Sequence, residues 1–280
     1  MAIVGIVVLT LAVRAAAGVE LGGDLLGHLA LLAGFVMLLA LAMRIPGPDT
    51  RGALRHLLVV AVMFTLYMTL ARAPFAAIPW SADAALAKVD RILFFGTSPA
   101  LWMEARLTPG WLELLAFAYG FFVPFINLSI LVGVFGRPDR ERDLFVTGLA
   151  LLYAMSFLGY LFLPARGPVV EMAGEFQAPL LGGIFHQIVL TSVERSGGPH
   201  GAFPSLHVGV SLYVCFFDLA FNRLRGLIYL PLVALIVVAT VALRYHYVID
   251  LAAGALLAWA ASRLASRLLA RRRSAAGAAP

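Results

Sequence analysis

The stretch Arg244–Asp250 carries the residue types best suited to chemistry, because it places an imidazole and a carboxylate four residues apart in an otherwise apolar sequence. On a helix this spacing puts His246 and Asp250 on one face, one turn apart. The carboxylate can then accept a hydrogen bond from one ring nitrogen, which leaves the other as a lone pair for nucleophilic attack. Ionisable groups are costly near a bilayer, so the pair indicates function. The alternative is a polar helix start at the membrane surface.

The sequence around this pair is that of a polytopic membrane protein. Of the 280 residues, 62% are hydrophobic and 13% are charged, whereas soluble domains average about 45–50% and about 25%. We therefore predict an all-α transmembrane helical bundle. The net charge of +6 lies mainly in short loops and at the C-terminus, which indicates topology and not a nucleic-acid partner. The single cysteine, Cys215, excludes an intrachain disulfide and a multi-cysteine metal site.

Apolar runs separated by charged, Gly-rich or Pro-rich turns predict about eight spans. The first is expected to be a retained span, because no basic segment precedes it to make a signal peptide. The spans cover residues 2–19, 25–43, 54–71, 111–134, 144–163, 204–221, 227–243 and 245–269. They divide the chain into N-terminal transmembrane helices (1–71), an extracytoplasmic or interfacial segment (72–110), a transmembrane core (111–270) and a cytoplasmic tail (271–280). Residues 84–95 are expected to form an amphipathic interfacial helix, and residues 164–203 form the longest polar loop.

The basic residues set the predicted orientation. An even number of spans puts both termini on one side, and cytoplasmic loops carry an excess of Lys and Arg. With both termini inside, thirteen of the 21 Lys and Arg residues are cytoplasmic: Arg44, Arg51, Arg55, Arg137, Arg140, Arg142, Arg223, Arg225, Arg263, Arg267, Arg271, Arg272 and Arg273. The segments 72–110 and 164–203 then face outward, together with the starts of the sixth and eighth spans.

Three polar segments meet on the outer face in this topology. They are Pro164–Pro168 after the fifth span, Gly201–His207 at the start of the sixth, and Arg244–Asp250 at the start of the eighth. Two of the three are helix N-termini, where free N–H groups and the helix dipole attract anions. Pro204 suits the first position of the sixth span.

The side chains of these segments suit a phosphoester group. Arg166 and Arg244 offer planar forks that are always charged, and Ser205 can donate to an anionic oxygen. His207 and His246 supply a general acid and a nucleophile, the second backed by its carboxylate. Together they predict a phosphoester-transfer site that needs no metal.

These segments also carry a family resemblance. The chain resembles the type 2 phosphatidic acid phosphatase and haloperoxidase superfamily, membrane enzymes with a six-helix catalytic core. The motifs of that superfamily run Lys-x6-Arg-Pro, Pro-Ser-Gly-His and Ser-Arg-x5-His-x3-Asp. Residues Pro204–His207 match the second motif with Leu in place of Gly, and His246 and Asp250 match the end of the third. Arg166–Pro168 is a loose match to the first.

The sequence departs from these motifs at two positions. Gly159 stands where the first motif has lysine, and Thr240 stands where the third has arginine. Arg244 is the candidate replacement for that arginine, from a different position. The departures, with Gly201–His207 and the segment 90–102, resemble the inositol phosphorylceramide synthase branch, and the third motif is also similar to that of sphingomyelin synthases. The resemblance covers roughly residues 90–259.

The resemblance implies a role for each matched residue. His246 is expected to be the nucleophile that forms a phospho-histidine, with Asp250 orienting it and stabilising its charge. His207 is expected to protonate the leaving oxygen and then to deprotonate the acceptor. The groups expected to hold the phosphoryl oxygens are Arg166, Ser205 and Arg244. No cofactor and no metal are implied.

The expected partners are a lipid phosphoester, an acceptor that is either water or an alcohol such as inositol or a lipid headgroup, and the bilayer. The expected location is a bacterial cytoplasmic (inner) membrane, with the site on its extracytoplasmic side. Alternatives are a simple lipid phosphate or polyprenyl phosphate phosphatase and a non-enzymatic transporter of anionic lipid. A membrane haem protein with His207 and His246 as axial ligands is also an alternative, against which Asp250 and Arg166 argue.

Overall fold

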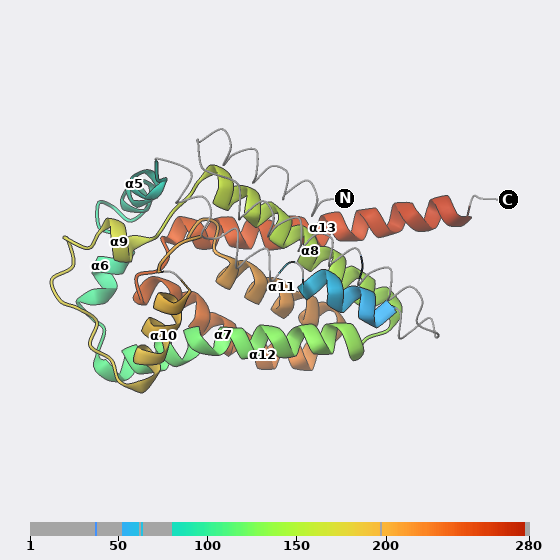
Figure 1. Ribbon diagram of the computed structural model, residues 1–280, viewed down its shortest axis with the longest axis horizontal. Coiled ribbons are helices and arrows are strands. Elements are labelled where there is room, and N and C mark those ends of the chain that lie inside the picture. Colours follow the sequence, from blue (N-terminus) through green and yellow to red (C-terminus); the bar gives the residue numbers. More distant parts are fainter. Residues whose placement is uncertain (1–36, 38–51, 62, 64–79, 197, 278–280) are drawn as a thin grey trace.

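The computed structural model describes residues 52–61, 63, 80–196 and 198–277, together with Met37, and every regular element within these ranges is a helix (Figure 1). The predicted span at 2–19, the span at 25–43 apart from Met37, and residues 62 and 64–71 of the span at 54–71 lie outside the described residues. The labelled helices are α5 (Asp83–Leu93), α6 (Pro99–Glu104), α7 (Pro109–Phe135), α8 (Asp139–Phe162), α9 (Pro168–Glu171), α10 (Ile184–Arg195), α11 (Leu206–Phe221), α12 (Arg223–Ala242) and α13 (Val248–Gly277).

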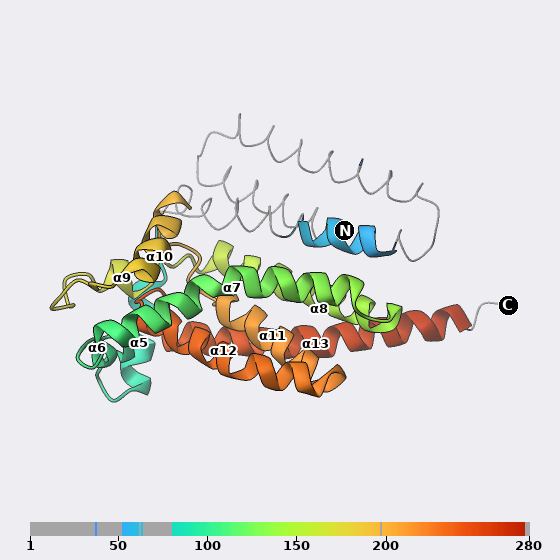
Figure 2. The same cartoon turned by 90° about the horizontal axis from the view of Figure 1, so that it is seen from below.

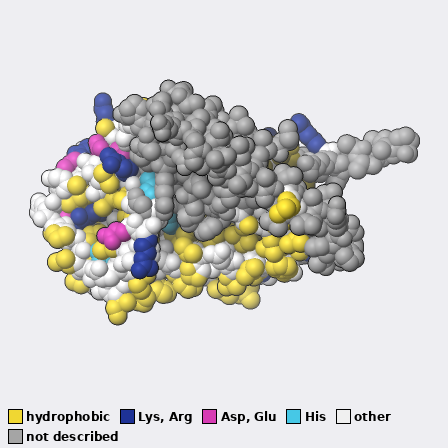
Figure 3. Space-filling model, in the orientation of Figure 1, with side chains coloured by type: hydrophobic (Ala, Val, Ile, Leu, Met, Phe, Trp, Pro, Cys, Tyr) yellow, Lys and Arg dark blue, Asp and Glu magenta, His cyan; other side chains and the backbone are white. Residues whose placement is uncertain are grey.

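Four of these helices, α7, α8, α12 and α13, are long and apolar enough to cross a membrane. The helix Gly52–Ala61 and α11 are shorter apolar helices. These helices coincide with the predicted spans, so the prediction of an all-α polytopic membrane protein is confirmed. Figure 3 shows hydrophobic side chains along the flank of the long helices, with most of the charged side chains in view gathered at one end.

Residues at the helix ends explain where the spans begin. Thr108 caps α7 by accepting from the N–H of Trp111, with Pro109 at the first helical position. Asn222 caps α12 in the same way by accepting from the N–H of Arg225. The sixth span was predicted to start at Pro204, but α11 starts at Leu206 with Ser205 as its cap.

Helix α11 lies in the middle of the bundle, where it packs against α7, α8, α12 and α13. Its contact with α13 depends on two glycines. A Cβ at Gly254 would lie 2.4 Å from the carbonyl oxygen of Ser205, and one at Gly209 would lie 3.1 Å from that of Gly254. Small residues allow membrane helices to approach closely, and here they bring the starts of α11 and α13 side by side.

The short helices α5, α6, α9 and α10 gather at the end of the bundle where α11 and α13 begin (Figures 1 and 2). Two of them, α9 and α10, lie within the segment 164–203 that was predicted as a loop. Helix α10 packs along α7, where the carboxylate of Glu113 accepts from the N–H groups of Phe185 and His186 at 3.0 and 3.1 Å. Helix α13 continues to Gly277, through most of the predicted tail, and reaches beyond the other labelled helices at the opposite end.

Candidate active site

Main-chain hydrogen bonds tie together the three segments predicted to converge. The N–H of Ala202 donates to the carbonyl of Ala165 at 2.9 Å, and the N–H of Ser205 donates to that of Asp250 at 3.1 Å. A third bond of 2.7 Å joins the N–H of Val169 to the carbonyl of Arg244. The segments around residues 165–169, 202–205 and 244–250 therefore form one hydrogen-bonded unit.

Gly167 allows the first segment to lie directly on the third. Its φ is +92°, and a Cβ there would lie 2.2 Å from the carbonyl oxygen of Tyr245. A side chain at this position would be both strained and in collision with backbone. The glycine therefore lets Arg166 sit next to the segment that carries His246.

His246 and Asp250 come together, but not on one helix face as predicted. Helix α13 begins at Val248, so His246 lies in the turn before it. His246 Nδ1 lies 3.5 Å from Asp250 Oδ2 but only 2.9 Å from the carbonyl oxygen of Ala202. Oδ2 itself accepts from the N–H of Tyr247 at 2.9 Å. The carbonyl of Ala202 is thus the nearer group that orients the ring, and Asp250 contributes charge close to it.

This geometry fixes the proton on the neutral His246 ring. A carbonyl oxygen can only accept, so Nδ1 carries the hydrogen and Nε2 is left as a lone pair. Nε2 lies 3.3 Å from the hydroxyl oxygen of Ser205, which can donate to it. The Ser205 hydroxyl is buried and also accepts from the N–H of Val208 at 3.4 Å. Ser205 therefore contacts the nitrogen expected to be the nucleophile.

His207 is held by aromatic rings on α7. Its ring stacks on Tyr119 with centroids 4.5 Å apart and contacts Phe122 at 4.4 Å. Tyr119 in turn stacks on Tyr245 at 5.1 Å. The ring centroids of His207 and His246 are 5.7 Å apart. The two imidazoles, 39 positions apart in the sequence, are therefore neighbours.

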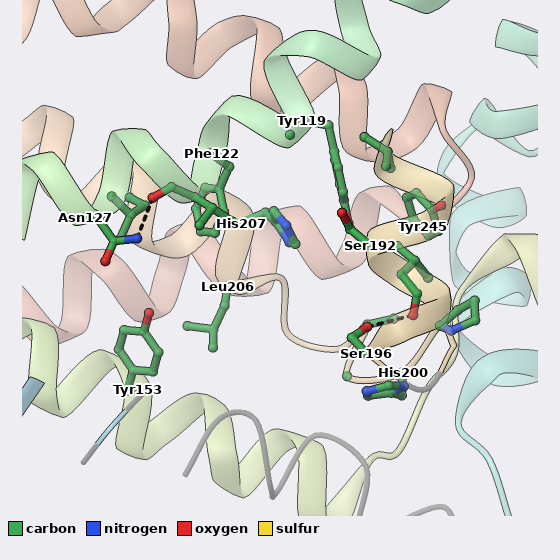
Figure 4. A pocket seen from close by; sticks show the side chains of 18 of the residues that line it. Tyr119, Phe122, Asn127, Tyr153, Ser192, Ser196, His200, Leu206, His207 and Tyr245 are labelled. Carbon is green, nitrogen blue, oxygen red and sulfur yellow. Dashed lines mark hydrogen bonds between the residues drawn. The ribbon is translucent and has the colours of Figure 1, made fainter. Parts of the chain in front are cut away.

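Both imidazoles line a cavity of about 770 Å³. Arg166 and His200 also line this cavity, and we call the part lined by these two residues and the two imidazoles its polar end. Figure 4 shows His207 directed into the cavity beside Phe122. On the other side of His207 the cavity runs between α7, α8 and the helix Gly52–Ala61, where its walls are mostly apolar. The lining residues of that part include Leu57, Val60, Met63, Val123, Ile126, Ile130 and Leu131.

Arg244, predicted to bind substrate, does not line this cavity. Its guanidinium donates to Glu104 Oε1 at 2.9 Å and to the carbonyl of Ala178 at 3.0 Å, and it lies 3.8 Å over the ring of Phe176. Burial lowers the pKa of Arg244, and the Glu104 carboxylate opposes this change. The backbone of Arg244 has a φ of +67°. In this conformation the side chain binds Glu104 and lies outside the cavity that the two histidines line. Arg244 anchors α6 and the segment before α10 to the start of α13.

Replacing Arg244 by Leu should therefore lower stability and leave substrate binding unchanged. Removing one partner of a buried ion pair costs about 3 kcal/mol, because the other charge stays buried. We expect a lower thermal unfolding midpoint in detergent, with the KM for a phosphoester within about twofold of the parent. Arg106→Leu, which removes an exposed arginine at the same end, is the control. A tenfold rise in KM at unchanged unfolding midpoint would return Arg244 to the site.

Two functional candidates on α5 were missed by sequence reasoning. Asp83 and Asp90 are 1% exposed and accept hydrogen bonds from the backbone of the site. The hydroxyl of Tyr247 donates to Asp83 at 3.1 Å. Burial raises the pKa of the Tyr247 phenol, and the Asp83 carboxylate raises it further. Burial raises the pKa of Tyr245 to about 12, so both phenols stay neutral. The sequence signal for the two aspartates is their spacing, which puts both on the same face of the predicted amphipathic helix as its apolar residues, where a carboxylate is unusual.

A bundle of apolar helices with two imidazoles and an arginine at the polar end of a largely apolar cavity is the arrangement expected of a membrane protein that acts on phosphoesters. Comparison with known families gives the same result, since the PAP2 superfamily matches residues 84–264, well over half of the chain. The chain belongs to the PAP2 superfamily, which supports a function of the phosphatase or phosphotransferase type. The search of the curated proteins and that of the solved structures gave no match. Within the described residues, no cluster of three His, Cys, Asp or Glu side chains could hold a metal ion.

Proposed function

We propose that this protein is an integral membrane enzyme that transfers the phosphoryl group of a lipid phosphoester through a phospho-histidine intermediate. The observation that carries the proposal is the shared cavity, which brings His207, His246 and Arg166 together at its polar end and continues between apolar helices. A lipid phosphoester has the same two parts, because its phosphoryl group suits the polar end of the cavity and its hydrocarbon chain suits the apolar part. The centroid separation of 5.7 Å puts both imidazoles within reach of one phosphorus–oxygen bond.

In the first half of the reaction, the lone pair of His246 Nε2 attacks phosphorus and forms an N–P bond. The P–O bond to the lipid breaks, and His207 gives a proton to the leaving oxygen. Asp250, 3.5 Å from Nδ1, stabilises the positive charge that develops on the His246 ring. Arg166 and the Ser205 hydroxyl bind the phosphoryl oxygens, the latter by turning from Nε2 to the new anion.

In the second half, His207 takes a proton from the acceptor as the acceptor oxygen attacks phosphorus. The N–P bond breaks, and the electron pair returns to His246 Nε2. If the phosphoryl group carries no further ester, water as acceptor gives inorganic phosphate. If it still carries one ester, water gives a phosphomonoester and an alcohol gives a new phosphodiester. The inositol phosphorylceramide synthase-like branch corresponds to the new phosphodiester, which we propose on the resemblance of its motifs to residues 201–207 and 244–250.

We place the site on the extracytoplasmic side of a bacterial inner membrane, with both termini inside. Support comes from the basic residues, which concentrate in the segments on the other side of the predicted spans. The structure puts the ends of α7 and α8 that carry Arg137, Arg140 and Arg142 opposite the end that carries the two histidines (Figure 2). The boundaries of the N-terminal helices (1–71), the interfacial segment (72–110) and the catalytic core (111–270) are part of this proposal.

Arg166→Ala should lower kcat/KM by about 100-fold, because charge-assisted hydrogen bonds to an anion contribute about 1.5–3 kcal/mol. Arg166→Lys should recover only part of this loss, since an ammonium cannot form the two-pronged contact. Steady-state kinetics with a lipid phosphoester measure both. Arg195→Ala is the matched control from the same outer segment. Equal activity of Arg166→Ala and the parent would remove Arg166 from the site.

The test of the proposed function is product analysis with purified protein. Candidate lipid phosphoesters are incubated with and without inositol or diacylglycerol, and free phosphate and new phospholipid are quantified separately. Free phosphate in every case identifies a lipid phosphate or polyprenyl phosphate phosphatase. New phospholipid that depends on the added alcohol identifies a transferase. Transfer of lipid between leaflets without cleavage of any phosphorus–oxygen bond would show a transporter and refute the proposal.

A further inference from the structure

Helix α5 buries two carboxylates where an amphipathic helix normally buries apolar side chains. Its buried positions are Asp83, Leu86, Ala87 and Asp90, a single stripe with the spacing of one helix face. The two aspartates lie seven residues apart at the ends of this stripe, and each is 1% exposed. Among the described residues, neither forms an ion pair with a basic side chain. Buried carboxylates are retained only where strong donors satisfy them, so their donors identify what they do.

Asp83 binds the backbone that carries Arg166. Oδ2 accepts from the N–H of Arg166 at 2.8 Å, and Oδ1 accepts from the N–H of Gly167 at 2.7 Å. The same Oδ1 accepts from the hydroxyl of Tyr247 at 3.1 Å, one residue after His246. One carboxylate therefore joins the segment that presents the guanidinium to the segment that presents the nucleophile.

Asp90 binds the start of α13. Its two oxygens accept from the N–H groups of Val248 at 2.7 Å and Ile249 at 2.9 Å, the first two residues of that helix. These N–H groups have no partner within the helix, and a negative charge also complements the helix dipole. Burial raises the pKa of the Asp90 carboxyl above its ordinary value, and the hydrogen bonds from the two N–H groups oppose part of this rise. Asp90 thus fixes the end of α13 that directly follows His246.

The two carboxylates are linked by a rigid element. Seven residues of α-helix correspond to a rise of about 10.5 Å, and α5 holds this spacing between its two contacts. We propose that Asp83 and Asp90 are positioning residues, and that α5 fixes the spacing between Arg166 and His246 needed for phosphoryl transfer. This inference rests on the proposed function, because it assigns the two residues a role in that reaction.

The test uses Asp90→Asn and Asp83→Asn in the full-length protein. Asn replaces one carboxylate oxygen by an NH2 group, which donates and cannot accept, so one of the two main-chain N–H groups that now bind separate oxygens of Asp90 loses its acceptor. Misplacement of a reacting group by about 1 Å costs about 100-fold in rate. For Asp90→Asn we expect kcat to fall about 10- to 100-fold with KM within about threefold of the parent, because the nucleophile moves. For Asp83→Asn we expect KM to rise as well, because Arg166 moves with its backbone.

Three further measurements separate positioning from stability. Asp90→Glu keeps two acceptor oxygens and should recover part of the kcat lost in Asp90→Asn. If Asp90→Asn does not fold, the kcat of Asp90→Glu, whose longer side chain shifts the start of α13, is compared with the parent instead. Glu175→Gln is the matched control, since it removes an exposed carboxylate that binds Arg91 of the same helix at 2.5 Å without touching the site backbone. Its kcat and KM should stay within about twofold of the parent. Thermal unfolding of every variant in detergent gives the folded fraction by which kcat is corrected.

Folded Asp90→Asn with the parent's kcat would overturn the inference, as would a loss in kcat no larger than the loss of folded protein. In either case the parent still turns over lipid phosphoester, so the proposed function stands. If the parent itself cleaves no phosphorus–oxygen bond in any lipid tested, the proposed function fails, and the role of α5 in catalysis fails with it.

Discussion

His246→Ala should abolish turnover while leaving the fold intact, with a loss in kcat of about 10⁴-fold or more, as expected when a covalent nucleophile is removed. His246 lines the cavity, and its free nitrogen, Nε2, lies 3.3 Å from the hydroxyl oxygen of buried Ser205. No neighbouring side chain can replace it, because the other close imidazole, His207, is stacked on the α7 aromatics in a different orientation. The fold should survive, since the main-chain bonds between the three segments do not involve the ring.

The intermediate offers a direct measurement beside kinetics. A substrate labelled in its phosphoryl group should leave label on the parent protein after rapid denaturation. A phospho-histidine is labile to acid and stable to base, which distinguishes it from a phosphoserine on Ser205. No label should remain on His246→Ala. Label on a residue other than His246, or full turnover by His246→Ala, would refute its role.

His207→Gln should lower kcat by about 10²- to 10⁴-fold, the range expected for loss of a general acid. The size of the loss should depend on the leaving group, because an oxygen that departs readily as an anion needs no proton. We therefore expect a much smaller defect with an aryl phosphate whose phenol is acidic than with an alkyl phosphoester. His246→Ala should show no such recovery, since a nucleophile is required for every substrate.

A comparison of the two substrate types in parent, His207→Gln and His246→Ala separates the two roles. His200→Gln is a useful control, because His200 lines the same cavity but has no assigned part in the chemistry. Its alkyl and aryl activities should change in parallel. The comparison uses kcat/KM, which reports the formation of the phospho-histidine and not the second half, where His207 acts as a base on both substrates. Equal losses of kcat/KM in His207→Gln on both substrates would mean that His207 positions the phosphoryl group and does not protonate the leaving oxygen.

The helices of this protein follow from the sequence to a large extent. Residues 111–134, 144–163 and 227–243 lie in predominantly apolar runs, and a chain in a bilayer satisfies its backbone polar groups most simply as a helix. The helix predicted at 84–95 is found at Asp83–Leu93. It follows from the sequence because its apolar residues recur with the period of an amphipathic helix. Helix α10 was missed, because it lies in a polar segment where its start depends on Glu113 of another helix. A contact between distant segments leaves no local pattern.

For the site, the sequence by itself indicated which groups can do chemistry: two imidazoles, a neighbouring carboxylate and an arginine, at the ends of spans predicted to share one membrane face. Only the tertiary structure decided how they are used. It places the Arg244 guanidinium on Glu104 and Ala178, outside the cavity that the two histidines line, because a buried cation binds the carboxylate and carbonyl that its backbone brings near. It also shows Asp83 and Asp90 bound to the backbone beside the two histidines and Arg166. The sequence did not indicate these contacts, because their partners are main-chain N–H groups, which every residue but proline possesses and no sequence motif distinguishes.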